Sequence, residues 1–185
     1  TVDRIADRNN RGSVGTKSWR SGGTKSSRPV ERSMWFDDFD HEAHVRRAIE
    51  LGREAAERGD NPYGSVLVRD DRVVMEARNA VVTEDDLAAH PELALARRAA
   101  RELDPEERVE TVMYTSTEPC PMCAGGVYHA GLGGVVYSVS AERSGEFGTD
   151  LVVPSSEVFA GGSREVPVVG PVCEEEGLAL RRAFG

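Results

Sequence analysis

Lysine is missing from most of this chain. The 185 residues contain two lysines, both before residue 34, whereas residues 34–185 carry fifteen arginines and twenty-nine acidic residues. Residues 1–33 therefore have a net charge of +5 and residues 34–185 a net charge of −14. A surface of negative sign repels a phosphate backbone, which argues against extended nucleic-acid contacts by the larger part. Adaptation to concentrated salt, which screens surface charges at short range, is an alternative reason for this composition.

Long hydrophobic runs are also absent from the sequence. No apolar stretch approaches the roughly 20 residues that a membrane-spanning helix needs, and the first residues lack the apolar run of a signal peptide. We therefore expect a soluble, cytoplasmic protein. The hydrophobic content of 39% is enough for one ordinary core, which predicts a single folded domain over residues 34–185.

Cysteine is scarce, and its spacing is informative. The chain has three cysteines, Cys120, Cys123 and Cys173. Three cysteines cannot form the disulfide framework of a small secreted domain. A Cys-x-x-Cys pair such as Cys120 and Cys123 in a reducing compartment instead indicates metal or redox chemistry.

The first 33 residues have a composition unlike the rest. Residues 12–29 are rich in Gly, Ser, Thr, Lys and Arg and show neither a helical nor a strand period of apolar residues. We predict that residues 1–33 form a disordered basic tail. An RNA-binding arm is the functional alternative, and upstream sequence read through before a start at Met34 is another. Charge runs usually mark solvated segments, which favours the readings without an RNA-binding role.

Helical and strand patterns alternate along the remaining sequence. Apolar residues at helical spacing predict a helix from about residue 41 that ends near Gly59, and β-prone runs at 65–69 and 72–78 predict a hairpin. Further strands are expected at 111–116, 134–139 and 166–169, and further helices at 91–103, 120–130, 156–160 and 174–183. This order predicts an α/β fold with a mixed sheet covered on both faces. The second helix is expected to carry one apolar face made of Leu93, Ala96, Ala100 and Leu103.

The strongest functional signal combines two short motifs. The tripeptide His90-Pro91-Glu92 precedes Pro119-Cys-Pro-Met-Cys123 by about one helix and one strand, which matches the H-x-E and P-C-x-x-C signature of zinc deaminases. Cys120 and Cys123, three residues apart at a helix start, project from the same face. A histidine at the start of a neighbouring helix can complete a three-ligand zinc site with a fourth position left for water.

Glu92 has a separate expected role. It follows His90 by two residues, too close in the sequence for a comfortable fourth ligand, but well placed to face a water molecule at the metal. We therefore predict that Glu92 is the catalytic proton shuttle.

Three other interpretations compete with a catalytic zinc site. Cys173 is a candidate fourth ligand of a closed structural zinc site, although this leaves the position of Glu92 unexplained. A strand followed by Cys-Pro-Met-Cys also fits a thioredoxin-like redox motif, in which His90 and Glu92 would be incidental. Taken alone, His90 fits a helix-capping role and Glu92 a first-turn acid stabilised by the helix dipole. The combination with the cysteine pair favours the catalytic site.

The stretch from about residue 61 to residue 148 resembles the guanine deaminase and tRNA adenosine deaminase branch of the cytidine deaminase superfamily. The most specific run is Tyr-Thr-Ser-Thr-Glu-Pro-Cys-Pro-Met-Cys-Ala-Gly at 114–125. The resemblance implies an α/β/α three-layer sandwich with a five-stranded mixed sheet, one zinc ion per subunit and a homodimer. It also implies that Asn79 contacts the substrate ring, with a turn asparagine as the alternative, and that Phe147 belongs to the pocket wall. Pro91 departs from the alanine usual in this family, but proline is tolerated at a helix start.

The motifs leave the deaminated ring open, because zinc, water and glutamate serve cytosine, guanine and adenine alike. The sequence that begins Tyr114-Thr-Ser favours the guanine-deaminase-like enzymes. We therefore expect a small nucleobase or nucleoside, a guanine-type purine first and cytosine or cytidine as further possibilities. A wobble adenosine in tRNA is the runner-up substrate, and a non-catalytic protein with structural zinc is the alternative from another class. His41 and His44, three apart on a helix, are expected to face solvent rather than to bind metal.

Overall fold

A five-stranded mixed sheet forms the centre of the protein. The computed structural model describes residues 34–149 and 151–184, and the expected basic tail at 1–33 lies outside them. The strands are β1 (Gly64–Arg69), β2 (Arg72–Arg78), β3 (Val112–Thr117), β4 (Gly134–Val139) and β5 (Val168–Val169). Their order is β2-β1-β3-β4-β5, with β1 antiparallel to both of its neighbours and β4 parallel to β3 and β5.

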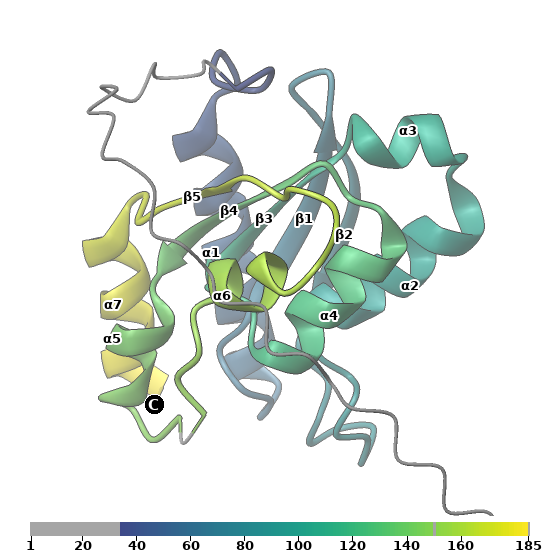
Figure 1. Cartoon of the computed structure of the whole chain (residues 1–185). Helices are drawn as coiled ribbons and strands as arrows, with labels where there is room; N and C mark the ends of the chain where they lie inside the picture. Colours follow the sequence, from purple (N-terminus) through teal and green to yellow (C-terminus); the bar gives the residue numbers. More distant parts are fainter. Residues whose placement is uncertain (1–33, 150, 185) are drawn as a thin grey trace, which may run out of the picture. The chain divides into compact units, whose positions relative to one another are not determined.

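The helices cover both faces of this sheet (Figure 1). They are α1 (His41–Glu57), α2 (Pro91–Glu102), α3 (Pro105–Val109), α4 (Pro121–Ala130), α5 (Ala141–Gly145), α6 (Ser155–Ala160) and α7 (Glu174–Phe184). Helices α1 and α7 pack on one face, and α2, α4 and α6 pack on the other. The predicted α/β three-layer sandwich with a five-stranded mixed sheet is confirmed. The short helices α3 and α5 were not expected from the sequence.

Side chains that alternate along the strands build a separate core on each face. On the face toward α1 and α7, Val66 of β1 and Tyr114 of β3 are fully buried. An adjacent residue of each strand, Leu67 after Val66 and Met113 before Tyr114, is fully buried toward α2 and α4. Successive side chains of a strand point to opposite faces, so a central strand with both faces covered is apolar throughout.

The expected apolar face of α2 needs correction. The residues of α2 that are buried are Glu92, Leu95, Ala96 and Ala99 together with Pro91, whereas Ala100 is exposed and Leu93 and Leu103 are only partly buried. Glu92, Ala96 and Ala99 lie on one helical stripe because their spacing is four and three residues. The sequence prediction used apolar residues alone. It therefore missed this stripe, which begins with the carboxylate of Glu92.

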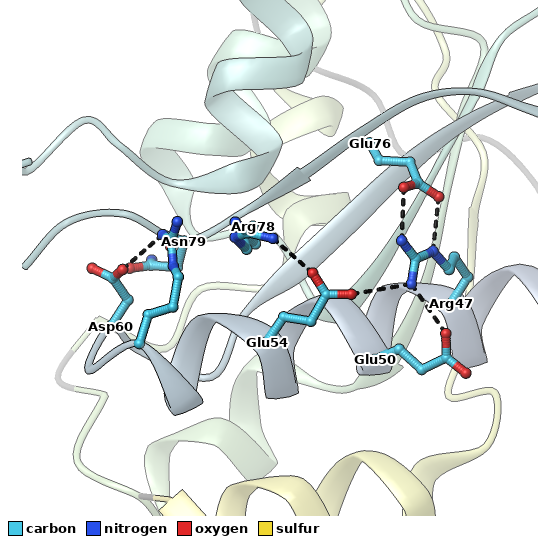
Figure 2. Close-up of polar contacts among 8 residues, drawn as sticks. Arg47, Glu50, Glu54, Asp60, Glu76, Arg78 and Asn79 are labelled. Carbon is cyan, nitrogen blue, oxygen red and sulfur yellow. Dashed lines mark hydrogen bonds and ion pairs between the residues drawn. The ribbon is translucent and has the colours of Figure 1, made fainter. Parts of the chain in front are cut away.

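Ion pairs join the edge strand β2 to α1 (Figure 2). Arg47 of α1 donates two hydrogen bonds of 2.8 Å to the carboxylate of Glu76 on β2, and it also contacts Glu50 and Glu54. Glu54 in turn accepts a 2.7 Å hydrogen bond from Arg78 at the end of β2. The network therefore fixes the C-terminal end of β2, immediately before Asn79.

Among the described residues, no helix combines the length and the apolar character that a membrane crossing would require.

Candidate active site and metal centre

Three side chains with metal-binding atoms converge at the starts of two helices. His90 is the N-cap residue of α2, Cys120 is the N-cap residue of α4, and Cys123 lies in the first turn of α4. His90 Nδ1 lies 3.5 Å from Cys123 Sγ and 3.9 Å from Cys120 Sγ, and all three donor atoms lie within 4.8 Å of one another. The structure thus brings together all three residues that the sequence predicted as ligands.

The donor set suits zinc in both chemistry and spacing. Tetrahedral zinc, with bonds of about 2.0–2.1 Å to nitrogen and about 2.3 Å to sulfur, would separate neighbouring donor atoms by roughly 3.5–3.8 Å. The two distances from His90 to the cysteines are close to this range. One histidine and two cysteines leave the fourth position of such a site to a water molecule.

The local electrostatics favour a thiolate at Cys120. Hydrogen bonding between the two sulfur groups, followed by the hydrogen bond from His90, lowers the pKa of Cys120 to about 4. The same sulfur–sulfur contact and burial raise the pKa of Cys123. The hydrogen bond with Cys120 raises the pKa of His90. Because the free N–H groups at the start of α4 also favour negative charge, the site attracts a cation.

Glu92 lies in the first turn of α2 and is 5% exposed. Its Oε1 accepts a 2.9 Å hydrogen bond from the hydroxyl of Thr115 on β3, which itself accepts one of 2.9 Å from Ser65 on β1. Burial raises the pKa of Glu92 above its usual value. A raised pKa makes it easier for the carboxyl group to take up a proton, which a proton carrier must do.

A small pocket opens over these groups. His90, Glu92 and Cys120 contribute to its wall. The other lining residues are Tyr63, Thr117, Glu118, Ser144 and Thr149.

Residues 39–139, more than half of the chain, match the family described as the cytidine and deoxycytidylate deaminase zinc-binding region. The chain belongs to this deaminase family. The expected superfamily and its zinc cofactor are therefore confirmed, and the protein is a zinc-dependent hydrolytic deaminase of the nucleobase and nucleoside class.

Relatives of this deaminase act on different rings. It is 36% identical to the guanine deaminase of Bacillus subtilis, over 60% of this chain and 72% of the relative. It is 32% identical to the tRNA-specific adenosine deaminase of the same organism, over 77% of this chain and 87% of the relative. It is 31% identical to the probable cytosine deaminase of Schizosaccharomyces pombe, over 77% of this chain and 90% of the relative.

A solved structure of the guanine deaminase from Nitrosomonas europaea is similar to the deaminase in fold. The TM-score is 0.64 at 23% sequence identity, over 77% of this chain and 83% of that structure. At this identity the likeness supports the fold alone.

Glu118 lines the pocket of the deaminase but is held by hydrogen bonds. Its Oε2 accepts from the backbone N–H of Ala141 at 2.8 Å, and its Oε1 accepts from the N–H and hydroxyl of Ser155 at 2.8 and 2.7 Å. The carboxylate therefore ties the turn before α4 to the first residues of α5 and α6. The side chain therefore has a structural role, because its hydrogen bonds join segments 23 and 37 residues apart.

Asn79 and Phe147 are not among the lining residues of the pocket. Asn79 is fully buried, its backbone N–H donates to the carbonyl of the lining residue Tyr63 at 2.9 Å, and its Oδ1 accepts from Val81. Phe147 is partly buried, and its ring packs against the guanidinium of Arg181. The backbone of Asn79 thus contacts a lining residue, whereas neither the Asn79 nor the Phe147 side chain lines the pocket.

Four lining residues were not predicted from the sequence: Tyr63, Thr117, Ser144 and Thr149. They come from the loop before β1, the end of β3, the short helix α5 and the loop after it. Thr117 lies inside the diagnostic run at 114–125, so its position there was a usable signal. The other three have no motif of their own, because only the tertiary arrangement brings their loops to the pocket.

The remaining cysteine and the histidine pair lie elsewhere. Cys173 immediately precedes α7 and packs against the core on the α1 side, outside the cluster of metal-binding atoms. His44 is 8% exposed, and its Nε2 donates a 2.7 Å hydrogen bond to the carboxylate of Asp71. His41 is partly buried, and its Nδ1 is hydrogen-bonded to the Tyr114 hydroxyl at 2.8 Å. The expectation that both histidines face solvent was wrong, because the hairpin turn folds over the first turn of α1.

Proposed function

We propose that this deaminase acts on a small guanine-type purine base or nucleoside, with Glu92 as its catalytic residue. His90, Cys120 and Cys123 are proposed as the ligands of one zinc ion per subunit. The observation that carries the proposal is a buried carboxyl group of raised pKa in the wall of the pocket that also contains the three donor atoms. A structural zinc site would have no use for such a carboxyl group.

The proposed reaction replaces an exocyclic amine of the ring with oxygen. Zinc bound by three protein ligands acts as a Lewis acid that lowers the pKa of water toward about 7. Glu92 takes one proton from the attacking water at a carboxylate oxygen and delivers it to the adjacent ring nitrogen. The water oxygen bonds to the ring carbon. Glu92 then takes the remaining proton from this oxygen and passes it to the exocyclic amine, whose bond to the carbon breaks as the carbonyl forms. The products are ammonia and a ring carbonyl.

Thr115 orients the proton carrier in this scheme. Its hydroxyl holds Glu92 Oε1, which leaves the other carboxylate oxygen for the proton transfers. Ser65 in turn fixes the hydroxyl of Thr115 from the neighbouring strand. The chain Ser65, Thr115 and Glu92 therefore limits the rotation of the carboxyl group.

Asn79 is proposed to contact the substrate ring, and Phe147 to support the pocket wall. The Nδ2 group of Asn79 is buried and has no hydrogen-bond partner among the described residues. An unpaired buried amide costs free energy, which a ring carbonyl or ring nitrogen of a bound substrate would offset. The backbone N–H of Asn79 also donates to the carbonyl of Tyr63, which lines the pocket.

The choice of ring and substrate size rests on relatives and on charge. The relative with 36% identity is a guanine deaminase, and the acidic charge of residues 34–185 opposes the phosphate contacts that a tRNA substrate needs. A tRNA adenosine deaminase at 32% identity makes wobble adenosine the second candidate. We further propose that the protein is cytoplasmic and forms a homodimer, the oligomeric state that the family resemblance implies. Sedimentation at several concentrations would test the dimer.

Ammonia release tests the proposal directly. Zinc-loaded protein would be offered guanine, cytosine and adenine, their nucleosides and a tRNA anticodon stem-loop, at low and high salt. We expect the fastest release from guanine or its nucleoside. Glu92→Gln should keep zinc and the fold but lose activity by about a hundredfold or more, because the amide has the same size but cannot carry the proton. Absence of turnover on every substrate, or substantial activity in the Glu92→Gln variant, would contradict the proposal.

A further inference from the structure

A buried guanidinium in α7 has no role in the reaction described above. Arg181 is 4% exposed, and its Nε has no hydrogen-bond partner in the part of the chain that the structure describes. Among residues 34–149 and 151–184, no carboxylate lies within ion-pair distance of it, whereas the next residue, Arg182, is exposed and pairs with Glu175. Burial of a charged group costs free energy, and a hydrophobic side chain of similar size would avoid this cost.

The specific contacts of Arg181 are with two aromatic rings. Its Cζ lies 4.7 Å from the centre of the Tyr63 ring and 5.4 Å from the centre of the Phe147 ring. Both distances fall within the range of cation–π attraction, and the flat guanidinium of arginine is well suited to packing against ring faces. Arg181 is thus in contact with both rings.

The three residues come from separate parts of the chain. Tyr63 lies in the loop between α1 and β1, Phe147 follows α5, and Arg181 lies in α7. Tyr63 is part of the pocket wall, and its carbonyl accepts the hydrogen bond from Asn79. The contacts of Arg181 therefore connect the C-terminal helix to the pocket wall.

We propose that Arg181 is a positioning residue that fixes the Tyr63 ring as a stacking wall for the flat ring of the substrate. This inference rests on the proposed function, because it presupposes an aromatic substrate in the pocket. Stacking of a base on an aromatic side chain gains from a ring held in one orientation, since less conformational entropy is lost on binding. Arg181 acts on binding rather than on the proton transfers, which belong to Glu92.

Arg181→Met tests the proposal, because methionine keeps an unbranched apolar chain but removes the charge. Arg181→Lys keeps the charge without the flat group, and Arg182→Met makes the same change at the exposed neighbour. Zinc content and far-UV circular dichroism should match the parent in all three. We expect Arg181→Met to raise KM about tenfold with kcat within about twofold, Arg181→Lys to give an intermediate KM, and Arg182→Met to leave both constants unchanged.

A measurement without substrate tests the positioning step separately. Zinc-loaded protein labelled with carbon-13 tyrosine would be measured by NMR, with the ring signals of Tyr63 assigned from the Tyr63→Phe variant. These signals should shift in Arg181→Met and keep their positions in Arg182→Met. Unchanged Tyr63 signals, or an active Arg181→Met variant with parental KM, would overturn the inference. A parent protein that releases no ammonia from any substrate would instead contradict the proposed function, and the tyrosine spectra would still decide the role of Arg181.

Discussion

The buried carboxylates of Asp60, Glu92 and Glu118 differ in the number of groups that hydrogen-bond to them. Asp60 accepts from Val82, from Thr83 and from Arg58, and Glu118 accepts two backbone N–H groups and a hydroxyl. Hydrogen bonds to a carboxylate stabilise its charged form. Glu92 accepts one side-chain hydrogen bond, from Thr115, and burial raises its pKa. This difference agrees with the proton transfer that is proposed for Glu92.

Zinc content should separate the two kinds of cysteine. We expect Cys120→Ala to abolish stoichiometric zinc binding, because it removes one of three donor atoms of the cluster. Cys173→Ala is the matched control and should keep one zinc ion per chain, since Cys173 lies outside the cluster. Metal analysis after dialysis measures both. Loss of zinc from the Cys173→Ala variant would favour a closed structural site instead.

Asp71 should contribute stability that depends on pH. The hydrogen bond from His44, together with that from the backbone of Asp40, holds the pKa of Asp71 below its usual value. A carboxyl whose pKa is lowered by folding stabilises the protein above its unfolded pKa of about 3.9, and this contribution is lost as the pH falls through the folded value.

Asp71→Asn should therefore lower the free energy of unfolding at pH 6, and the difference from the parent should shrink as the pH falls below about 4. Urea unfolding of both proteins across this range measures the difference. A gap that stays constant with pH would mean that the carboxylate charge has no part in it.

At the scale of elements, α1 and β1 approach so closely that a side chain is excluded between them. A Cβ atom at Gly64 of β1 would collide with the backbone of Ala48 and Gly52 in α1. This contact fixes the start of β1, and hence the position of Tyr63 immediately before it. The close approach thus connects packing on the α1 side of the sheet to the pocket wall.

Gly64→Ala should destabilise the fold by about 1–3 kcal/mol, because backbone atoms must shift to accept the methyl group. Gly125→Ala in α4 is the matched control, since a Cβ there meets nothing within 4 Å. Alanine is a better helix former than glycine, so the control should stabilise the protein by about 0.5–1 kcal/mol. Thermal and urea unfolding measure both changes. Equal effects of the two substitutions would contradict the close-packing argument.

At the scale of the whole molecule, residues 34–184 contain the entire sheet, its helices and the pocket. The same region has the acidic charge, whereas the cationic excess lies in residues 1–33. A phosphate-bearing substrate would need basic side chains gathered near the pocket, and binding would weaken steeply as salt rises. A large, phosphate-bearing substrate would therefore depend on the basic residues in 1–33.

Removal of residues 1–33 should leave the rate on a free base or nucleoside unchanged. Neither the full chain nor the shortened one should convert adenosine to inosine in a tRNA anticodon loop. Ammonia release and inosine content measure the two activities. Efficient editing of tRNA by the full chain that disappears on truncation would make the tRNA substrate the better choice and assign the basic segment to RNA binding.

The sequence by itself determined the fold class, the family and the convergence of His90, Cys120 and Cys123. Local rules were enough for this, because proline after the cap residue starts α2 and α4, and alternation or apolar runs mark the strands. A motif at a helix start predicts the same local geometry wherever the helix lies in the fold. The prediction of the buried face of α2 was wrong because the buried carboxylate of Glu92 interrupts the local apolar pattern.

Only the tertiary structure decided which residues surround the metal-binding cluster. Tyr63, Ser144 and Thr149 reach the pocket from loops far apart in the sequence, and Arg181 reaches Tyr63 from the last helix. His44 is buried because the hairpin turn with Asp71 packs on α1, a contact between segments 27 residues apart. Burial and electrostatic environment are properties of such long-range contacts, which leave no periodic signal in the sequence. The chemistry was therefore readable from local motifs, whereas the walls that select a substrate depend on the packing of the whole domain.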